Sequence, residues 1–123
     1  MISTILDSRI AVNQALQVLE IFRELDAEMP IGEAVSFLLV ANGQTRHGGG
    51  ISITDVCNLG RFAIGTASRY VNALALKDRK GNPGHEVVIK EWDPTDDRKT
   101  VLRISPKGQR VIQRIQHVLG LKV

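Results

Sequence analysis

The side chains best suited to chemistry lie in the C-terminal two thirds of the chain, in two stretches. Residues 64–77 carry hydroxyl, guanidinium and amide groups at helical spacing, and residues 79–99 carry several cations. Hydroxyl and ammonium groups can bind phosphates, whereas guanidinium and amide groups can also hydrogen-bond the edges of bases. The candidate binding residues are Thr66, Ser68, Arg69, Asn72, Arg79, Lys80, Lys90, Asp96, Arg98 and Lys99.

The charge distribution favours the same chemistry. Residues 1–45 contain two Lys/Arg against six Asp/Glu, a net charge of −4, whereas residues 46–123 contain fourteen against seven, a net charge of +7. A basic region favours a polyanionic partner, because each contact to a phosphate releases condensed counterions. Solvated surface lysines and arginines would give the same count, so charge alone leaves both interpretations open.

Catalytic and metal-binding patterns are not found in the sequence. His47, His85 and His117 lie far apart, and none falls in a spacing such as His-x-x-x-His. Residues 43–48 have the glycine spacing of a phosphate-binding P-loop, but two further glycines replace its lysine and hydroxyl residue. We therefore predict no catalytic residue, no metal and no cofactor.

Length and composition predict one domain inside the cell. A chain of 123 residues suffices for one core, and its single cysteine, Cys57, excludes an internal disulfide. The longest apolar stretch, residues 34–41, falls short of the roughly 20 residues that cross a bilayer. Residues 1–10 lack the cationic start of a secretory signal. We expect a cytoplasmic protein with no membrane partner.

Hydrophobic periodicity predicts two helices in the first third of the chain. The first, over residues 8–28, begins at a cap at Asp7 or Ser8 and carries a wide apolar stripe. Pro30 suits the first turn of a second helix, which is apolar nearly all round and should end at Asn42-Gly43. The polar, glycine-rich residues 44–50 predict a mobile loop.

The middle of the chain predicts a short strand and two helices. Residues 51–53 alternate as a minimal edge strand, and Thr54 is the expected cap of a short helix through Val56 and Leu59. A further helix runs from about Ile64 to Lys77. Its predicted buried face consists of Ala67, Val71 and Leu74, with the polar candidates opposite.

A hairpin and a last helix complete the predicted fold. Two β-rich runs, 86–92 and 99–105, enclose a charged tip, and Ser105-Pro106 begins a helix that Gly120 ends. This element order predicts an α+β winged helix-turn-helix with a long N-terminal helix, a β-hairpin wing and a C-terminal helix. The helix-turn-helix would span residues 52–78 and the wing 86–105, within one domain over residues 1–123.

Several stretches resemble the multiple-antibiotic-resistance regulator (MarR) family. Residues 93–102, with the acid-rich Asp-x-Arg of Asp96-Asp97-Arg98, and then residues 105–108 resemble its wing signature. Residues 55–57 resemble the Glu-Leu-Ala of the family, and residues 66–74 resemble its recognition helix. The similarity covers about residues 30–115, although the segment 78–85 is longer than the usual link into the wing.

The resemblance implies a function and residue assignments. Members of the family are obligate dimers that bind palindromic operators as transcriptional regulators, and many release DNA when a ligand or oxidant arrives. It implies that Arg98 enters the minor groove with Asp96 orienting its guanidinium, and that Ser68 and Arg69 lie in the major groove. A guanidinium suits the negative potential of a narrow minor groove. Asn72, like Arg69, could read base edges, and Thr66 and Ser68 could donate to phosphates. The cations on the hairpin and before it would contact the DNA backbone: Arg79, Lys80, Lys90, Lys99 and Arg103.

The termini would then form the dimer. The terminal helices of the family interlace to form the dimer and a ligand pocket. This chain is short for the family, which argues against a classical pocket for a small-molecule effector. Dimerisation through residues 8–28 and 106–123 is still expected.

Simpler structural interpretations of the same residues remain open. Arg98 could close the hairpin by pairing with a neighbouring aspartate, and Arg69 could be an ordinary solvent-facing residue. Trp92, at the base of the wing, is predicted to pack rather than to stack on bases, and Cys57 is predicted to face inward without a redox function.

We predict a homodimeric transcriptional repressor that binds double-stranded DNA. Two alternatives share the predicted fold. One is a phage or plasmid accessory protein in replication or polymerase recruitment, able to bind single-stranded DNA. The other is a winged helix that binds only protein.

Overall fold

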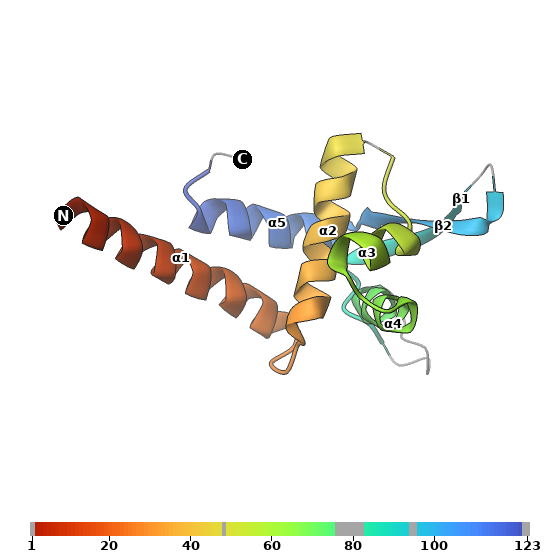
Figure 1. The fold of residues 1–123 in the computed structure, drawn as a ribbon, viewed down its shortest axis with the longest axis horizontal. Helices are drawn as coiled ribbons and strands as arrows, with labels where there is room; N and C mark the ends of the chain where they lie inside the picture. The colour runs from red at the N-terminus through yellow and green to blue at the C-terminus, as the bar shows by residue number, and fades with distance from the viewer. Residues whose placement is uncertain (1, 48, 76–82, 94–95, 122–123) are drawn as a thin grey trace. The chain divides into compact units, whose positions relative to one another are not determined.

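A computed structural model describes residues 2–47, 49–75, 83–93 and 96–121. Within these ranges helices and strands follow one another in the predicted order (Figure 1). They are α1 (Ile2–Leu25), α2 (Ile31–His47), α3 (Ile53–Gly60), α4 (Ile64–Leu74), β1 (Val88–Asp93), β2 (Asp96–Ile104) and α5 (Pro106–Val118). The α+β winged-helix architecture is confirmed. The contacts divide the chain into two compact units, residues 30–109 and residues 1–29 with 110–123.

The core of the unit 30–109 forms where α2, α3, α4 and β2 pack together. Its largest completely buried apolar side chains come from all of these elements and from the start of the wing: Phe37, Val40, Val56, Val71, Leu74, Val87 and Leu102. Full burial of one such side chain stabilises the fold by about 1.5–3 kcal/mol. The helix predicted to be apolar all round, α2, is therefore central to this unit.

Helix α2 continues through the glycine that we predicted would end it. A Cβ atom at Gly43 would lie 2.2 Å from Cγ2 of Ile51, so this glycine permits close packing instead of breaking the helix. The next residue, Gln44, accepts a hydrogen bond at its Oε1 from the backbone N–H of Ile104, at 2.7 Å. The predicted loop is therefore wrong over residues 44–47, because α2 runs to His47, whereas residues 49 and 50 lie outside the helices and strands.

The start of α3 differs from the prediction. Ser52, and not Thr54, is the cap: Ser52 Oγ accepts from the backbone N–H of Asp55 at 3.1 Å, and Asp55 Oδ2 accepts from that of Ser52 at 3.0 Å. These reciprocal bonds form a capping box. Immediately before it, the predicted edge strand is reduced to one antiparallel bridge between Ile51 and Leu102.

The hairpin strands reach closer to the tip than predicted. β1 and β2 pair antiparallel from Val88 opposite Ile104 to Trp92 opposite Thr100, and a register shift follows between Trp92 and Asp93. Because β2 begins at Asp96, Arg98 belongs to a strand and not to the loop where we placed it.

The second unit contains α1 and most of α5. Helix α1 begins at Ile2, earlier than predicted, while α5 begins at Pro106 and Gly120 follows it with a φ of 75°, as predicted. Arg114 donates to Glu24 Oε2, and this hydrogen bond holds the pKa of the Glu24 carboxyl below its ordinary value. A cleft of about 700 Å³ between α1 and α5 is lined mainly by Leu16, Ile21, Gln113 and Val118.

Across the described ranges, no helix has both the length and the apolar composition that a bilayer crossing requires.

Candidate nucleic-acid interface

A tight turn joins α3 to α4. Arg61 adopts a left-handed conformation with φ of 59°, and the backbone N–H of Phe62 donates to the carbonyl of Cys57 at 3.0 Å. The thiol of Cys57 donates in return to the Phe62 carbonyl at 2.9 Å. The Phe62 ring lies over Gly60, where a Cβ atom would come within 2.3 Å of it. The turn is therefore closed by contacts on both sides of Arg61.

One face of α4 is fixed against the core. Ala67, Val71 and Leu74 are fully buried, as their spacing predicted. Tyr70 makes an edge-to-face contact with Phe62, with ring centroids 5.3 Å apart. Tyr70 also covers Gly32 of α2, where a Cβ atom would meet its ring at 2.6 Å. These contacts determine which side of α4 remains available for a ligand.

The available side of α4 carries the polar residues that we predicted. Arg69 is exposed, and Thr66, Ser68 and Asn72 are partly exposed. Helix α4 has no side-chain cap, because Ala63 occupies the N-cap position. The described helix ends at Leu74, short of the predicted Lys77.

The segment before the wing is tied to the end of α4. The backbone N–H groups of His85, Glu86 and Val87 donate to the carbonyls of Ala73, Ala75 and Leu74 at 2.9–3.0 Å. Carbonyls in the last turn of a helix lack partners within the helix, so this segment satisfies them. Gly84 passes so close that a Cβ atom would lie 2.1 Å from the Ala75 carbonyl oxygen.

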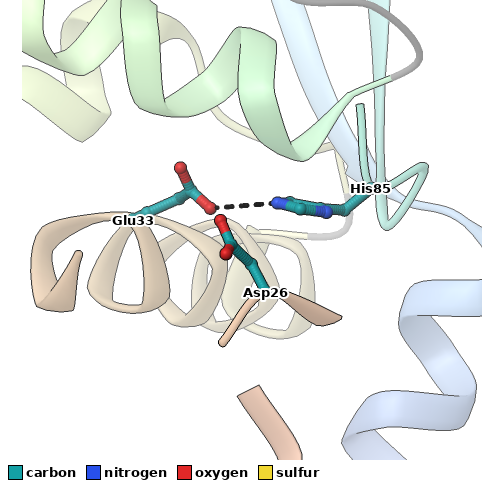
Figure 2. Close-up of side chains that lie close together, drawn as sticks. All are labelled: Asp26, Glu33 and His85. Atoms are coloured by element: carbon teal, nitrogen blue, oxygen red, sulfur yellow. Dashed lines mark ion pairs between the residues drawn. The ribbon is translucent and has the colours of Figure 1, made fainter. Parts of the chain in front are cut away.

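Two side chains, Ser105 and Glu33, also contact residues 85–86 of this segment. Ser105 Oγ donates to the Glu86 carbonyl at 2.6 Å and accepts from the backbone N–H of Gly108 at 3.0 Å. Glu33 of α2 is buried, and its Oε2 lies 3.3 Å from Nε2 of His85 (Figure 2). The wing therefore starts from a fixed position relative to α4.

Lys90 connects the wing directly to α4. Its Nζ donates to Asn72 Oδ1 at 3.2 Å, which brings together two residues predicted to bind the same ligand. A groove of about 450 Å³ runs beside this contact, with Ala75 and Val88 in its lining. Arg103 instead pairs with Glu91, at 3.3 Å, on the opposite face of the hairpin. The structure thus separates two wing cations that the sequence could not distinguish.

The remaining predicted residues lie wholly or partly outside what the structure describes. Asp96, Arg98 and Lys99 belong to β2, but their side chains are outside the described part. Arg79 and Lys80 lie outside the described residues. The minor-groove assignment of Arg98 and its alternative, an ion pair at the hairpin tip, both stay predictions.

Solved structures share this architecture. No family model and no curated protein matches the sequence. The S. aureus MepR–DNA complex matches with a TM-score of 0.67 at 13% identity, over 98% of this chain and 84% of that one. Transcriptional regulator Tm0710 from Thermotoga maritima matches with a TM-score of 0.61 at 19% identity, over 94% and 70% of the two chains. RV1404 from Mycobacterium tuberculosis matches with 0.62 at 17%, over 96% and 73%.

These three proteins are MarR-family regulators. The chain has the MarR fold. The resemblance inferred from the wing and the helix-turn-helix is thereby confirmed at the level of the fold.

Near the candidate interface, two further features of this MarR fold were not predicted from the sequence. Trp92 is 69% exposed, so its predicted packing is wrong. The attachment of residues 85–87 to α4 was also missed, although Gly84 in a Pro-Gly pair was a signal that the backbone approaches another segment closely.

Proposed function

We propose that this protein is a transcriptional regulator that binds double-stranded DNA, with α4 in the major groove and the wing in the adjacent minor groove. The hydrogen bond between Lys90 and Asn72 carries the proposal, because it makes the wing and the polar side of α4 one continuous surface. The shared fold supports it, since MepR is solved as a complex with DNA.

Each candidate residue has a function in this arrangement. Arg69, exposed on α4, reads base edges, and Thr66, Ser68 and Asn72 contact phosphates or bases beside it. Arg98 enters the minor groove with Asp96 orienting it. The remaining cations of the set contact the DNA backbone: Arg79, Lys80, Lys90 and Lys99.

We also propose that the protein is a homodimer through its terminal helices. Val12, Leu16 and Leu19 recur at spacings of four and three residues, so they share one face of α1. They are 60%, 55% and 44% exposed, and Leu121 after α5 is 59% exposed. A second copy would remove this apolar surface from water. Two copies of α4 would then read a palindromic site, as a cytoplasmic repressor that catalyses no reaction.

The test of DNA binding begins with selection of a preferred site from a random duplex library. Affinities are then measured on the selected duplex, a random duplex and the separated strands. For Arg69→Gln we expect discrimination between the two duplexes to fall by about 1–3 kcal/mol for each base that the guanidinium reads. Arg103→Gln is the matched control, because it removes the same charge from the opposite wing face and should preserve discrimination.

Two results would count against the proposal. Tighter binding to separated strands than to the duplex would favour the accessory function in replication. No binding to any nucleic acid would favour a winged helix that binds protein.

A further inference from the structure

Trp92 lies exposed near the outer end of the described part of the wing. It is the only tryptophan in the chain, and 69% of its surface is accessible to solvent. Tryptophan is on average highly buried in folded proteins, because its large indole surface is costly to hydrate. Trp92 pairs with Thr100 at the last regular position before the register shift.

The register shows which side of the wing carries this indole. Side chains alternate along a strand, so Val88, Lys90 and Trp92 share one face of β1. Val88 is buried in the core and Lys90 contacts Asn72, so this face is the one turned toward α4. The opposite face carries the Glu91–Arg103 pair. Trp92 therefore lies on the α4 side of the wing, further from the core than Lys90.

The position of Lys90 indicates what would cover Trp92. A duplex with one groove on α4 and the next groove on the wing has a sugar–phosphate backbone running between them. Lys90 lies between those elements and offers an ammonium group to a phosphate. The deoxyribose next to that phosphate presents an apolar surface of the kind that an indole can cover.

We propose that Trp92 is a DNA-contact residue whose indole packs on the deoxyriboses of the backbone strand that Lys90 neutralises. The proposal rests on the duplex-binding function proposed above and adds to it a contact that is neither ionic nor base-specific. Such a contact strengthens binding to every duplex sequence alike. It releases no counterion, so it leaves the salt dependence of binding unchanged.

The test uses the fluorescence of the full chain, because Trp92 is its only tryptophan and the emission reports on that side chain alone. Wild-type protein is titrated with the selected duplex, with a random duplex and with separated strands. We expect the emission to change on both duplexes. Trp92→Ala should weaken binding to both by about tenfold, because apolar indole surface is no longer buried, without changing the salt slope. Trp92→Phe should restore most of the affinity.

Ile89→Ala is the matched control. Ile89 is an exposed apolar side chain of the same strand, and alternation puts it, with its register partner Arg103, on the opposite face. We expect this variant to bind both duplexes like wild type. Equal melting temperatures of the variants would confirm that no difference in affinity comes from unfolding.

The other outcomes are distinct. Duplex binding with unchanged emission and with wild-type affinity for Trp92→Ala would overturn the contact at Trp92 and leave the proposed function standing. A smaller salt slope for Trp92→Ala would overturn it too, because it would mean that the indole acts indirectly, by positioning Lys or Arg side chains that neutralise phosphates. An emission change on separated strands alone would make Trp92 a base-stacking platform instead. Failure of the wild-type chain to bind any duplex would overturn the proposed function, and this inference with it.

Discussion

Arg61 occupies a backbone conformation that is unfavourable for its side chain. Its φ of 59° lies in the left-handed region, which costs a residue with a Cβ atom about 1–2 kcal/mol. Glycine adopts this conformation without that cost but loses more chain entropy on folding. We therefore expect Arg61→Gly to raise the free energy of unfolding by about 0.5–1 kcal/mol, measured by urea denaturation.

The control for this prediction is Arg61→Ala, which removes the guanidinium but keeps the Cβ atom. It should leave stability near that of wild type. Equal stabilisation by both substitutions would show that the guanidinium, and not the backbone conformation, is unfavourable in the turn.

For single residues, the sequence predicted which side of a helix faces the core better than it predicted the contact partners of exposed side chains. The periodicity of α4 correctly put Ala67, Val71 and Leu74 in the core and Arg69 outside. It could not distinguish Lys90 from Arg103, because their different partners depend on which face of the hairpin turns toward α4. The exposure of Trp92 was missed for a related reason: the wing extends past the core that would have covered it.

The N-cap of α3, the first helix of the helix-turn-helix, can be identified by mutation. The reciprocal bonds between Ser52 and Asp55 satisfy backbone N–H groups at this helix end. We expect Ser52→Ala to lower the free energy of unfolding by about 1 kcal/mol. Thr54→Ala, at the position that the sequence suggested as the cap, should change it by less than about 0.5 kcal/mol. A larger decrease at Thr54 than at Ser52 would contradict the structural assignment.

Among the helices and strands, the order was predictable and several ends were not. Amphipathic spacing and turn residues predicted each described helix and the hairpin in sequence order. The predicted end of α2 was wrong because Gly43 packs against Ile51, which belongs to the bridge with β2, and Gln44 bonds the backbone of Ile104 in β2. Local sequence rules cannot show that a glycine serves close packing when the contacting side chain comes from another element.

The proposed assembly of two chains depends on the exposed face of α1. A carboxylate at Leu16 would be buried without a partner in a dimer formed through this face. We expect Leu16→Glu to shift the protein from dimer to monomer in sedimentation and to weaken binding to an inverted repeat more than binding to one half-site. Asn13→Glu adds the same charge outside the Val12, Leu16 and Leu19 face, and it should remain dimeric.

A monomeric wild-type protein, or a dimer that Leu16→Glu leaves intact, would contradict dimerisation through this face. The sequence alone predicted long apolar stripes at both ends of the chain. It could not show that Val12, Leu16 and Leu19 would remain exposed after folding, because that depends on how much of α1 the other elements of the chain cover.

Dimethyl sulfate protection can show whether α4 and the wing occupy adjacent grooves of one duplex, on which the proposed function depends. This reagent methylates guanine N7 in the major groove and adenine N3 in the minor groove. On the selected site we predict protected guanines flanked by protected adenines, repeated in two half-sites about one helical turn apart. Arg98→Ala should abolish the adenine protection and keep the guanine protection. Protection of one groove only, or an unchanged pattern in Arg98→Ala, would contradict this mode of binding.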